Sequence, residues 1–368
     1  MAQILFLGKR FYENDLPFCY LPLWILISTP LIPQMLCLTG IICTVRKKRN
    51  RTDLFMLCFL LGGISTVMLI RPVLYNGWRH FYFFYVPFFW FAAAGLNALI
   101  NHHVKIIQMG AAAIVCLSAI RTVNRITTLH PYEYIFLNQL VQDRIGDFDR
   151  DYWRLSTTEC MEWIAATERD VFSVGEINSS LDNTLIGLMP GLRNKIHIIN
   201  YNALHRYPAD YLIFNYSGQT GNETYFPLYE PVYSIERDGV KLGEVFKRIA
   251  SLAPEVQYVS PAQEIADGDF ETQWCSDQLQ NSEDTLLIEF TQPVSLQGLS
   301  LLPGDNEQEY ARSPEIYTSI DGDVWDKLPI TVSGLFDLSF PTTEARFIRI
   351  RNAVPAEFHW SIREILFY

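Results

Sequence analysis

The chain has 368 residues, of which 49% are hydrophobic, and its formal net charge is −11 at neutral pH. Residues 1–125 contain 12 Lys and Arg against 3 Asp and Glu, whereas the remaining residues contain 17 against 37. An acidic second part argues against nucleic acid as a partner, because binding to a phosphate backbone requires a basic surface.

Four apolar stretches fill the basic first part, at about residues 21–45, 53–70, 81–100 and 105–120. Each approaches the roughly 20 residues that a helix needs to cross a bilayer, so residues 1–125 are expected to form a membrane region of four helices. The basic segment 46–51 between the first two stretches favours the cytoplasmic side. We therefore expect a multi-pass protein of the cell (inner) membrane with its tail on the extracytoplasmic side.

This orientation places residues 1–20 outside the membrane, although the first residues lack the pattern of a signal peptide. Further spans on an upstream-encoded polypeptide are therefore expected to precede this chain.

A group of polar and aromatic residues, Tyr75, Trp78, Arg79 and His80, precedes the third apolar stretch. At the outer membrane surface, the guanidinium of Arg79 can bind a lipid phosphate through two hydrogen bonds. Ordinary snorkelling of Arg79 and His80 toward the wet headgroups is the alternative, and spacing alone favours it. The aromatic residues at 81–91 favour a packing or lipid-facing surface over a ligand site.

Four segments of the first half share their order and spacing with a known family. They are Phe18-Cys19-Tyr20-Leu21-Pro22-Leu23-Trp24-Ile25, residues 75–80 (Tyr-Asn-Gly-Trp-Arg-His), His130-Pro131-Tyr132-Glu133-Tyr134 with Asn138, and Asp151-Tyr152-Trp153-Arg154-Leu155-Ser156. Over residues 10–165 the chain resembles bacterial membrane glycosyltransferases of the protein mannosyltransferase type. The resemblance implies transfer of a sugar from a polyprenyl phosphate carrier to an acceptor outside the cytoplasm.

The resemblance assigns Arg79, His80, Tyr75 and Trp78 to the side of the site that binds the carrier phosphate. Members of the family take their catalytic acidic residues from a first external loop, which has no counterpart here, and Asn76 stands where they usually have Asp. No catalytic residue is therefore assigned, and whether this chain is an enzyme by itself stays open.

The tail begins with a predicted α/β domain over residues 131–250. Ser156-Thr157-Thr158-Glu159 has the pattern of a capping box that opens a helix. Strands are predicted at 170–174, 195–199 and 211–216, and a hairpin is predicted around Arg237-Asp238-Gly239. No nucleophile, carboxylate pair or phosphate loop stands out, which favours a structural or docking role.

A linker at 251–261 is predicted to lead to an all-β domain at 262–368. Its strands are expected at 286–290, 294–302, 315–320, 345–352 and 362–368, and short strands separated by Gly, Pro and Asp turns are typical of an antiparallel sandwich.

Four further motifs, in order, resemble those of the discoidin or coagulation factor 5/8 type C domain. They are Asp267-Gly268-Asp269-Phe270-Glu271-Thr272-Gln273-Trp274, Ser319-Ile320-Asp321-Gly322-Asp323-Val324-Trp325, Ala345-Arg346-Phe347-Ile348-Arg349-Ile350 and Ser361-Ile362-Arg363-Glu364-Ile365. The resemblance implies an eight-stranded jelly roll that binds sugars through loops at one end.

The same resemblance implies a structural Ca²⁺ bound by Asp267, Asp269, Thr272 and Glu364, whose hard oxygen ligands suit that ion. The alternative is that Asp267-Gly268-Asp269 is a polar turn. Candidate glycan-binding residues are Tyr310, Arg312, His359 and Trp360, whereas Trp274 and Trp325 are expected in the core.

Three functions follow from these features. The chain is either the carboxy-terminal portion of a glycosyltransferase with a carbohydrate-binding domain, a membrane-anchored carbohydrate-binding or adhesion protein without chemistry, or a scaffold whose tail binds a partner protein. The expected partners are membrane lipid, a polyprenyl-phosphate sugar, a glycan and the upstream-encoded polypeptide.

Overall fold

The computed structural model describes residues 3–46, 50–74, 77–187, 190–204, 207–226, 228–249, 256–306, 308–333 and 336–368. The chain divides into two compact units. The first contains Met1–Ser156, Asn215–Glu223 and Ile235–Gly243, and the second contains Thr157–Phe214, Thr224–Ser234 and Glu244–Tyr368.

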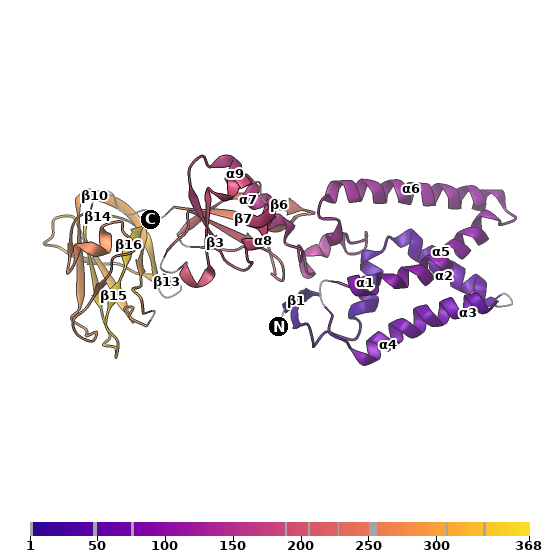
Figure 1. Ribbon diagram of the computed structural model, residues 1–368, viewed down its shortest axis with the longest axis horizontal. Helices are drawn as coiled ribbons and strands as arrows, with labels where there is room; N and C mark the ends of the chain where they lie inside the picture. Colours follow the sequence, from indigo (N-terminus) through magenta and orange to yellow (C-terminus); the bar gives the residue numbers. More distant parts are fainter. Residues whose placement is uncertain are drawn as a thin grey trace. The chain divides into compact units, whose positions relative to one another are not determined.

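The first unit is mainly helical and opens with a small hairpin of two strands (Figure 1). Its elements are β1 (Gln3–Phe6), β2 (Lys9–Tyr12), α1 (Tyr20–Ser28), α2 (Leu31–Arg46), α3 (Arg51–Leu57), the π-helical turn η1 (Cys58–Gly62), α4 (Gly63–Ile70), the 3-10 helix η2 (Arg79–Phe84), α5 (Tyr85–Ile100), α6 (Lys105–Leu129) and the 3-10 helices η3 (Glu133–Ile135) and η4 (Gln142–Asp147).

Three continuous helices in the described part are long and apolar enough to cross a membrane: Arg51–Ile70, Arg79–Ile100 and Lys105–Leu129. In their most apolar windows only 6%, 33% and 0% of the residues are buried within the protein. These helices correspond to the second, third and fourth predicted spans. A largely exposed apolar surface on each is what a lipid environment would cover.

The first predicted span, 21–45, is not one straight helix. It forms α1 and α2, which are bent by 115° at a break between Ser28 and Leu31. Pro30 has no amide hydrogen and favours an extended residue before it, and Thr29 is extended with φ −101° and ψ 135°. The basic residues 47–49, on which the predicted orientation depends, lie outside the described residues.

Side-chain amides replace the helical hydrogen bonds that are lost at this break. Asn138 donates to the carbonyl oxygens of Leu26 and Thr29 at 2.6 and 3.0 Å, and Gln34 donates to the same two oxygens at 2.6 and 2.7 Å. Asn138 is buried, so its side chain fixes the corner between α1 and α2.

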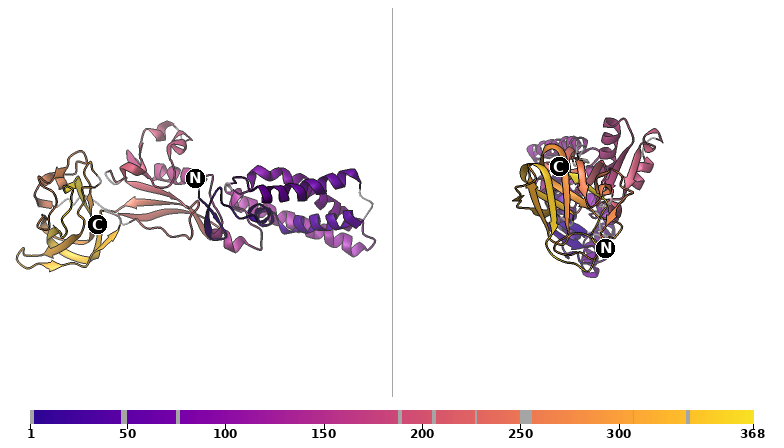
Figure 2. Two further views of the ribbon diagram at one scale, coloured as in Figure 1. Left: turned by 90° about the horizontal axis from the view of Figure 1, so that it is seen from below. Right: turned by 90° about the vertical axis from the view of Figure 1, so that its left-hand side faces the viewer.

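Several helices of the first unit run side by side (Figure 2), and two glycines set the packing of α2 on α5. A Cβ on Gly40 would lie 1.8 Å from the Phe91 carbonyl oxygen, and a Cβ on Gly95 would lie 2.0 Å from that of Leu36. Small residues allow helix backbones to approach closely, as is common in membrane helix pairs.

The α/β region contains a five-stranded sheet with the order β4-β3-β5-β7-β6. Its elements are α7 (Leu155–Thr167), β3 (Phe172–Glu176), α8 (Asp182–Gly187), α9 (Pro190–Arg193), β4 (Ile196–Ile199), the 3-10 helix η5 (Tyr201–Ala203), β5 (Tyr211–Asn215), β6 (Tyr229–Arg237) and β7 (Val240–Arg248). β3 pairs in parallel with β4 and β5. The strands predicted in this region are confirmed.

The predicted hairpin between β6 and β7 is also confirmed. Asp238 and Gly239 both have positive φ, 54° and 74°, as a two-residue hairpin turn requires. The carboxylate of Asp238 forms a two-fold ion pair with the guanidinium of Arg125 on α6. The turn is thereby attached to the end of that helix.

The start of α7 differs from the predicted capping box. The helix begins at Leu155, and its first amides donate to the Asp151 carboxylate, at 3.0 Å from Leu155 and 3.2 Å from Ser156. Asp151, which lies in the left-handed region with φ 46°, is therefore the capping residue. Glu159, the expected partner of Ser156 in the box, accepts a hydrogen bond from the Tyr233 hydroxyl at 3.2 Å.

Asp149, Arg150 and Asp151 are all buried and bind the segment 215–222. Asp149 accepts from the Gly218 amide at 2.8 Å and from the Ser217 hydroxyl at 3.2 Å. Arg150 donates to the Asn222 side chain at 2.8 Å and to backbone carbonyls. All three buried charged side chains thus have hydrogen-bond partners in this segment, which offsets part of the cost of their desolvation, and the Nε of Arg150 has no partner among the described residues.

The last domain is a β-sandwich, as predicted (Figure 1). Its larger sheet has the order β12-β11-β14-β10-β16, with β13 on β14 and β8 on β10, and a small sheet pairs β15 with β9. The elements are β8 (Val256–Ser260), the 3-10 helix η6 (Gln263–Ala266), β9 (Trp274–Cys275), β10 (Thr285–Leu302), β11 (Pro314–Ser319), β12 (Asp326–Lys327), β13 (Thr331–Ser333), β14 (Asp337–Asn352), β15 (Ser361–Ile362) and β16 (Glu364–Phe367).

Alternation along the strands builds the core of this domain. Leu286, Ile288 and Phe290 of β10 are each 0% exposed, and Ile348 on β14 is the antiparallel partner of Ile288. The two strands predicted at 286–290 and 294–302 form the single strand β10, which is interrupted by a bulge. Strand β8 lies in the stretch predicted to be linker.

Candidate functional site

An arginine beside two aromatic rings marks one loop region of the sandwich. The guanidinium carbon of Arg312 lies 4.0 Å from the ring centroid of Tyr310 and 5.2 Å from that of Phe358. Its Nη2 also donates to the Gln308 carbonyl at 2.8 Å. The cluster joins loops that are far apart in sequence and combines a planar cation with aromatic faces, which suits a polar ligand with apolar faces such as a sugar.

A buried glutamine holds these loops in place. Gln280 is 2% exposed, and its side-chain amide donates to the carbonyl oxygens of Tyr310 at 3.0 Å and His359 at 2.8 Å. The His359 ring is half-buried, and its Nδ1 lies 2.7 Å from the Ser276 carbonyl oxygen. Neither Gln280 nor Phe358 was expected at the site, because only their contacts over long sequence separations reveal these roles.

The three tryptophans singled out in the sequence of this domain lie in different environments. Trp360 is only 1% exposed and belongs to the core, so its ring is not an open platform for a sugar. It lines a hollow of about 270 Å³ together with Tyr310 and Phe336. Trp274 packs on the core as expected, whereas Trp325 is half-buried on the surface, where Arg349 lies 3.9 Å from its ring.

The four residues predicted to bind Ca²⁺ converge on one loop. The Asp267 carboxylate accepts from the Asp269 amide at 2.8 Å and from the Thr272 hydroxyl at 3.1 Å. Glu364, which is fully buried on β16, accepts from the Gly268 amide at 3.0 Å. The backbone therefore folds the predicted turn around Glu364, so the polar-turn interpretation and a ligand set are both compatible with this loop.

The charge balance of this loop bears on its fit to a cation. Burial raises the pKa of Glu364 to about 7, and the negative charges of Asp267 and Asp269 add to the rise. A divalent cation would relieve this repulsion. Among the described residues, however, no three His, Cys, Asp or Glu side chains lie close enough together to form a metal cluster, so part of the coordination would have to come from Thr272 and backbone oxygens.

The residues predicted to bind a lipid phosphate lie in the first unit. Trp78 is 3% exposed, and its indole N–H donates to the Ser28 hydroxyl at 2.8 Å, so it serves to pack η2 on α1. The guanidinium of Arg79 lies 4.6 Å from the Trp153 ring centroid. His80 is exposed beside it, and Tyr75 lies outside the described residues.

The segments that resemble the glycosyltransferases are brought together in this unit. Trp78 contacts α1 through Ser28, and Asn138 binds the end of the same helix. Tyr134 donates to Asp151, and Arg79 stacks on Trp153 from the same short segment. Four stretches spread over more than a hundred residues thus form one connected cluster.

The chain was compared with known solved structures. The CBM32-1 and CBM32-2 domains of Clostridium perfringens ZmpB match with 16% identity over 32% of this chain and 36% of theirs, at a TM-score of 0.28. A chitosan-binding module from a Paenibacillus sp. IK-5 chitosanase/glucanase, in complex with chitotriose, matches with 22% identity. The match covers 32% of this chain and 99% of that module, at a TM-score of 0.27. The CBM32 of AlyQ, in complex with 4,5-unsaturated mannuronic acid, matches with 17% identity. The match covers 31% of this chain and 95% of that module, at a TM-score of 0.25.

The match spans about a third of the length of the first of these structures. None of the curated proteins compared with the chain matches it. The family model of the F5/8 type C domain matches residues 250–365. That range contains the Tyr310–Arg312 loop, the Asp267 loop and all of the sandwich except the end of its last strand, and residues 250–365 are therefore an F5/8 type C domain.

Proposed function

We propose that the F5/8 type C domain of this chain binds a glycan through the loops around Arg312. The observation that carries this proposal is the position of the Arg312 guanidinium beside two aromatic rings, 4.0 Å from the centroid of Tyr310 and 5.2 Å from that of Phe358. The two aromatic residues offer faces for stacking on a sugar ring, and the guanidinium offers hydrogen bonds to its hydroxyl groups. Gln280 fixes the two loops relative to each other.

Binding of the full chain, solubilised in detergent, to an array of bacterial glycans tests this proposal. Arg312→Ala should weaken binding to the selected glycan by about tenfold or more, as is common for a central arginine in an interface. Arg349→Ala is the matched control, because Arg349 also stacks on an aromatic ring, that of Trp325, elsewhere on the sandwich. Equal losses in both variants, or none in Arg312→Ala, would contradict the assignment.

We also propose that the helical part is the carboxy-terminal portion of a membrane glycosyltransferase that uses polyprenyl-phosphate-linked sugar. The support is the resemblance over residues 10–165 and the clustering of its segments around α1, with Arg79 near Trp153. This chain supplies the residues on the carrier-phosphate side, and the catalytic acid comes from another segment. A membrane-anchored carbohydrate-binding protein without chemistry is the second candidate, favoured by the F5/8 type C match.

Sugar transfer from polyprenyl-phosphate sugars, by membranes that contain this chain with and without the product of the adjoining upstream sequence, separates the two candidates. Transfer only in the combined membranes supports the enzyme, and Arg79→Gln should then reduce it. Arg51→Gln, at the start of α3, is the control. No transfer in either preparation, together with glycan binding, supports the anchored binding protein.

The proposed location is a multi-pass inner membrane with the tail outside the cytoplasm. Cys275 is exposed and unpaired in the sandwich, so a membrane-impermeant maleimide should label it in spheroplasts with an intact inner membrane. Labelling only after lysis would reverse the orientation. Cys275→Ser provides the background signal from the other cysteines.

A further inference from the structure

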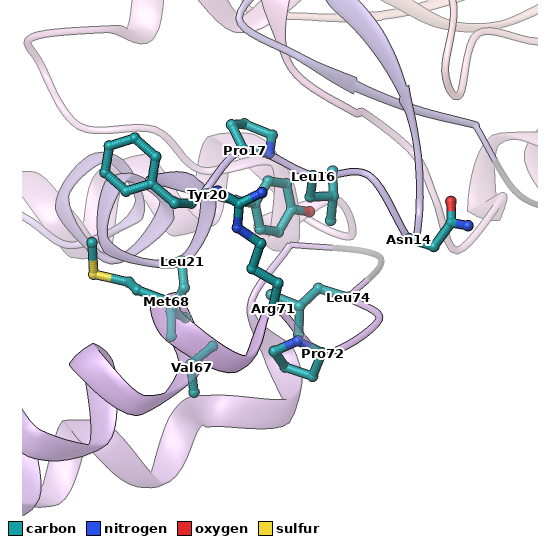
Figure 3. Close-up of a pocket in the computed structure, with 11 residues that line it drawn as sticks. Asn14, Leu16, Pro17, Tyr20, Leu21, Val67, Met68, Arg71, Pro72 and Leu74 are labelled. Atoms are coloured by element: carbon teal, nitrogen blue, oxygen red, sulfur yellow. The ribbon is translucent and has the colours of Figure 1, made fainter.

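A pocket in the first unit lies between the start of α1 and the C-terminal end of α4, and it contains none of the residues assigned above to a lipid-phosphate or glycan site. The space among its lining residues is about 320 Å³, part of which is open to solvent. The 11 lining residues come from two segments, 14–21 and 67–74, and all of them except Phe18 are labelled in Figure 3. The Leu74 amide donates to the Glu13 carbonyl at 3.4 Å and joins the two segments.

The polar part of this pocket is the side chain of Arg71, together with Asn14. Arg71 ends α4 in the left-handed region, with φ 48° and its amide bonded to the Val67 carbonyl at 2.9 Å. Its exposed side chain extends toward Tyr20 (Figure 3) and forms no ion pair with any residue that the structure describes. The amide of Asn14 adds a neutral hydrogen-bonding group at the rim.

The rest of the lining is apolar. Leu21, Val67 and Met68 lie on α1 and α4, and Phe18 is 57% exposed beside them. A pocket with a cation at one side and aliphatic side chains along two helices suits an amphiphile that has an anionic head and a hydrocarbon chain.

The place of Arg71 in the chain identifies the class of amphiphile. It directly follows Arg51–Ile70, one of the helices able to cross a membrane, so it falls at headgroup level if that helix spans the bilayer. We propose that this pocket binds the phosphate group of a membrane lipid through Arg71, with the lipid chain along Val67 and Met68. The proposal rests on the membrane location proposed above, but it involves neither Arg79 nor the F5/8 type C domain.

Lipid retention by the purified full chain in detergent tests this site without reference to cellular location or sugar transfer. Native mass spectrometry would measure binding of phosphatidylglycerol, undecaprenyl phosphate, phosphatidylcholine and inorganic phosphate. An anionic lipid should bind in preference to phosphatidylcholine, and Arg71→Gln should weaken that binding roughly tenfold, since a guanidinium forms strong charge-assisted bonds to phosphate. Arg71→Lys should restore part of it.

Arg51→Gln, at the opposite end of the same helix, should leave binding unchanged and serves as the control. Preference for undecaprenyl phosphate would identify the lipid as a polyprenyl carrier, and preference for phosphatidylglycerol would identify a bulk phospholipid; both support the site. Equal binding in Arg71→Gln and the unmodified chain, with unchanged circular dichroism, would overturn it. So would competition by inorganic phosphate at concentrations similar to those of the lipid.

Discussion

Gly40 on α2 and Gly95 on α5 lie in backbone contact, because a Cβ added to either residue would lie 2.8 Å from the amide nitrogen of the other. Real Cβ atoms essentially never approach backbone atoms so closely. The separation of the two helices is therefore set by the absence of side chains at this one crossing.

Replacing Gly40 by Val should force α2 away from α5. The new side chain would meet backbone atoms rather than a flexible side chain. We therefore expect the free energy of unfolding to fall by about 1–3 kcal/mol. Thermal unfolding of the full chain in detergent measures it. Gly62→Ala is the matched control, since a Cβ at Gly62 meets nothing within 4 Å, and this change should be neutral or slightly stabilising. Similar losses in both variants would refute the close-packing argument.

Asp149 should make stability depend on pH. Burial raises the pKa of the Asp149 carboxyl from 3.8 to about 6. Hydrogen bonds from Gly218 and Ser217 lower the pKa, but their effect is smaller than that of burial. The folded state then holds a proton that the unfolded state releases, so stability falls as pH rises from about 4 to 6, by about 3 kcal/mol at most. Asp149→Asn keeps an acceptor for Gly218 and should remove this slope.

Denaturant unfolding between pH 4 and pH 8 would measure the effect of Asp149. Asp147→Asn is a suitable control, because Asp147 is half-exposed and pairs with Arg144. A slope that persists in Asp149→Asn would assign the pH dependence to other groups.

Asn138→Ala should destabilise the corner between α1 and α2. The substitution removes three hydrogen bonds from a buried site, two to the carbonyl oxygens of Leu26 and Thr29 and one from the Leu140 amide, and we expect a loss of about 1–3 kcal/mol. Gln139→Ala, at the exposed next residue, should change little. A melting temperature that stays the same in Asn138→Ala would show that Gln34 alone holds the corner.

Calcium should stabilise the F5/8 type C domain if the loop around Glu364 binds it. We expect a melting temperature several degrees higher with millimolar Ca²⁺ than with a chelator, and Asp267→Asn should abolish the difference. The segment Asp321-Gly322-Asp323 offers a matched control, because it has the same Asp-Gly-Asp sequence but is not the loop folded around Glu364. Asp321→Asn should therefore leave the calcium effect intact. Identical melting temperatures with and without Ca²⁺ would show that the Asp267 loop is a polar turn that does not bind the ion.

Local patterns in the sequence predicted the strands well. Alternation at Leu286, Ile288 and Phe290 reflects one buried face, and the Asp238-Gly239 pair permits the backbone of a tight hairpin turn. Both signals lie within a few residues, so no knowledge of the tertiary fold is needed to use them.

Contacts between distant segments account for what the sequence did not reveal. The cap of α7 is Asp151, whose carboxylate is also bound by Tyr134 and Asn215, whereas the local pattern pointed to Ser156. Phe358 joins Arg312 only through the folding of the sandwich. The break before α2 did have a local signal in Pro30, but the apolar character of the whole stretch obscured it.

The turn residue Asp238 satisfies two requirements that no other amino acid meets together. Its backbone has positive φ, which Gly, Asn and Asp adopt readily, and its carboxylate pairs with Arg125. Asn or Gly would keep the turn and lose the charge, and Glu would keep the charge in a conformation that it adopts poorly. At this one position, a single aspartate, whose carboxylate is one methylene from the backbone, therefore determines both the hairpin turn and its attachment to a helix.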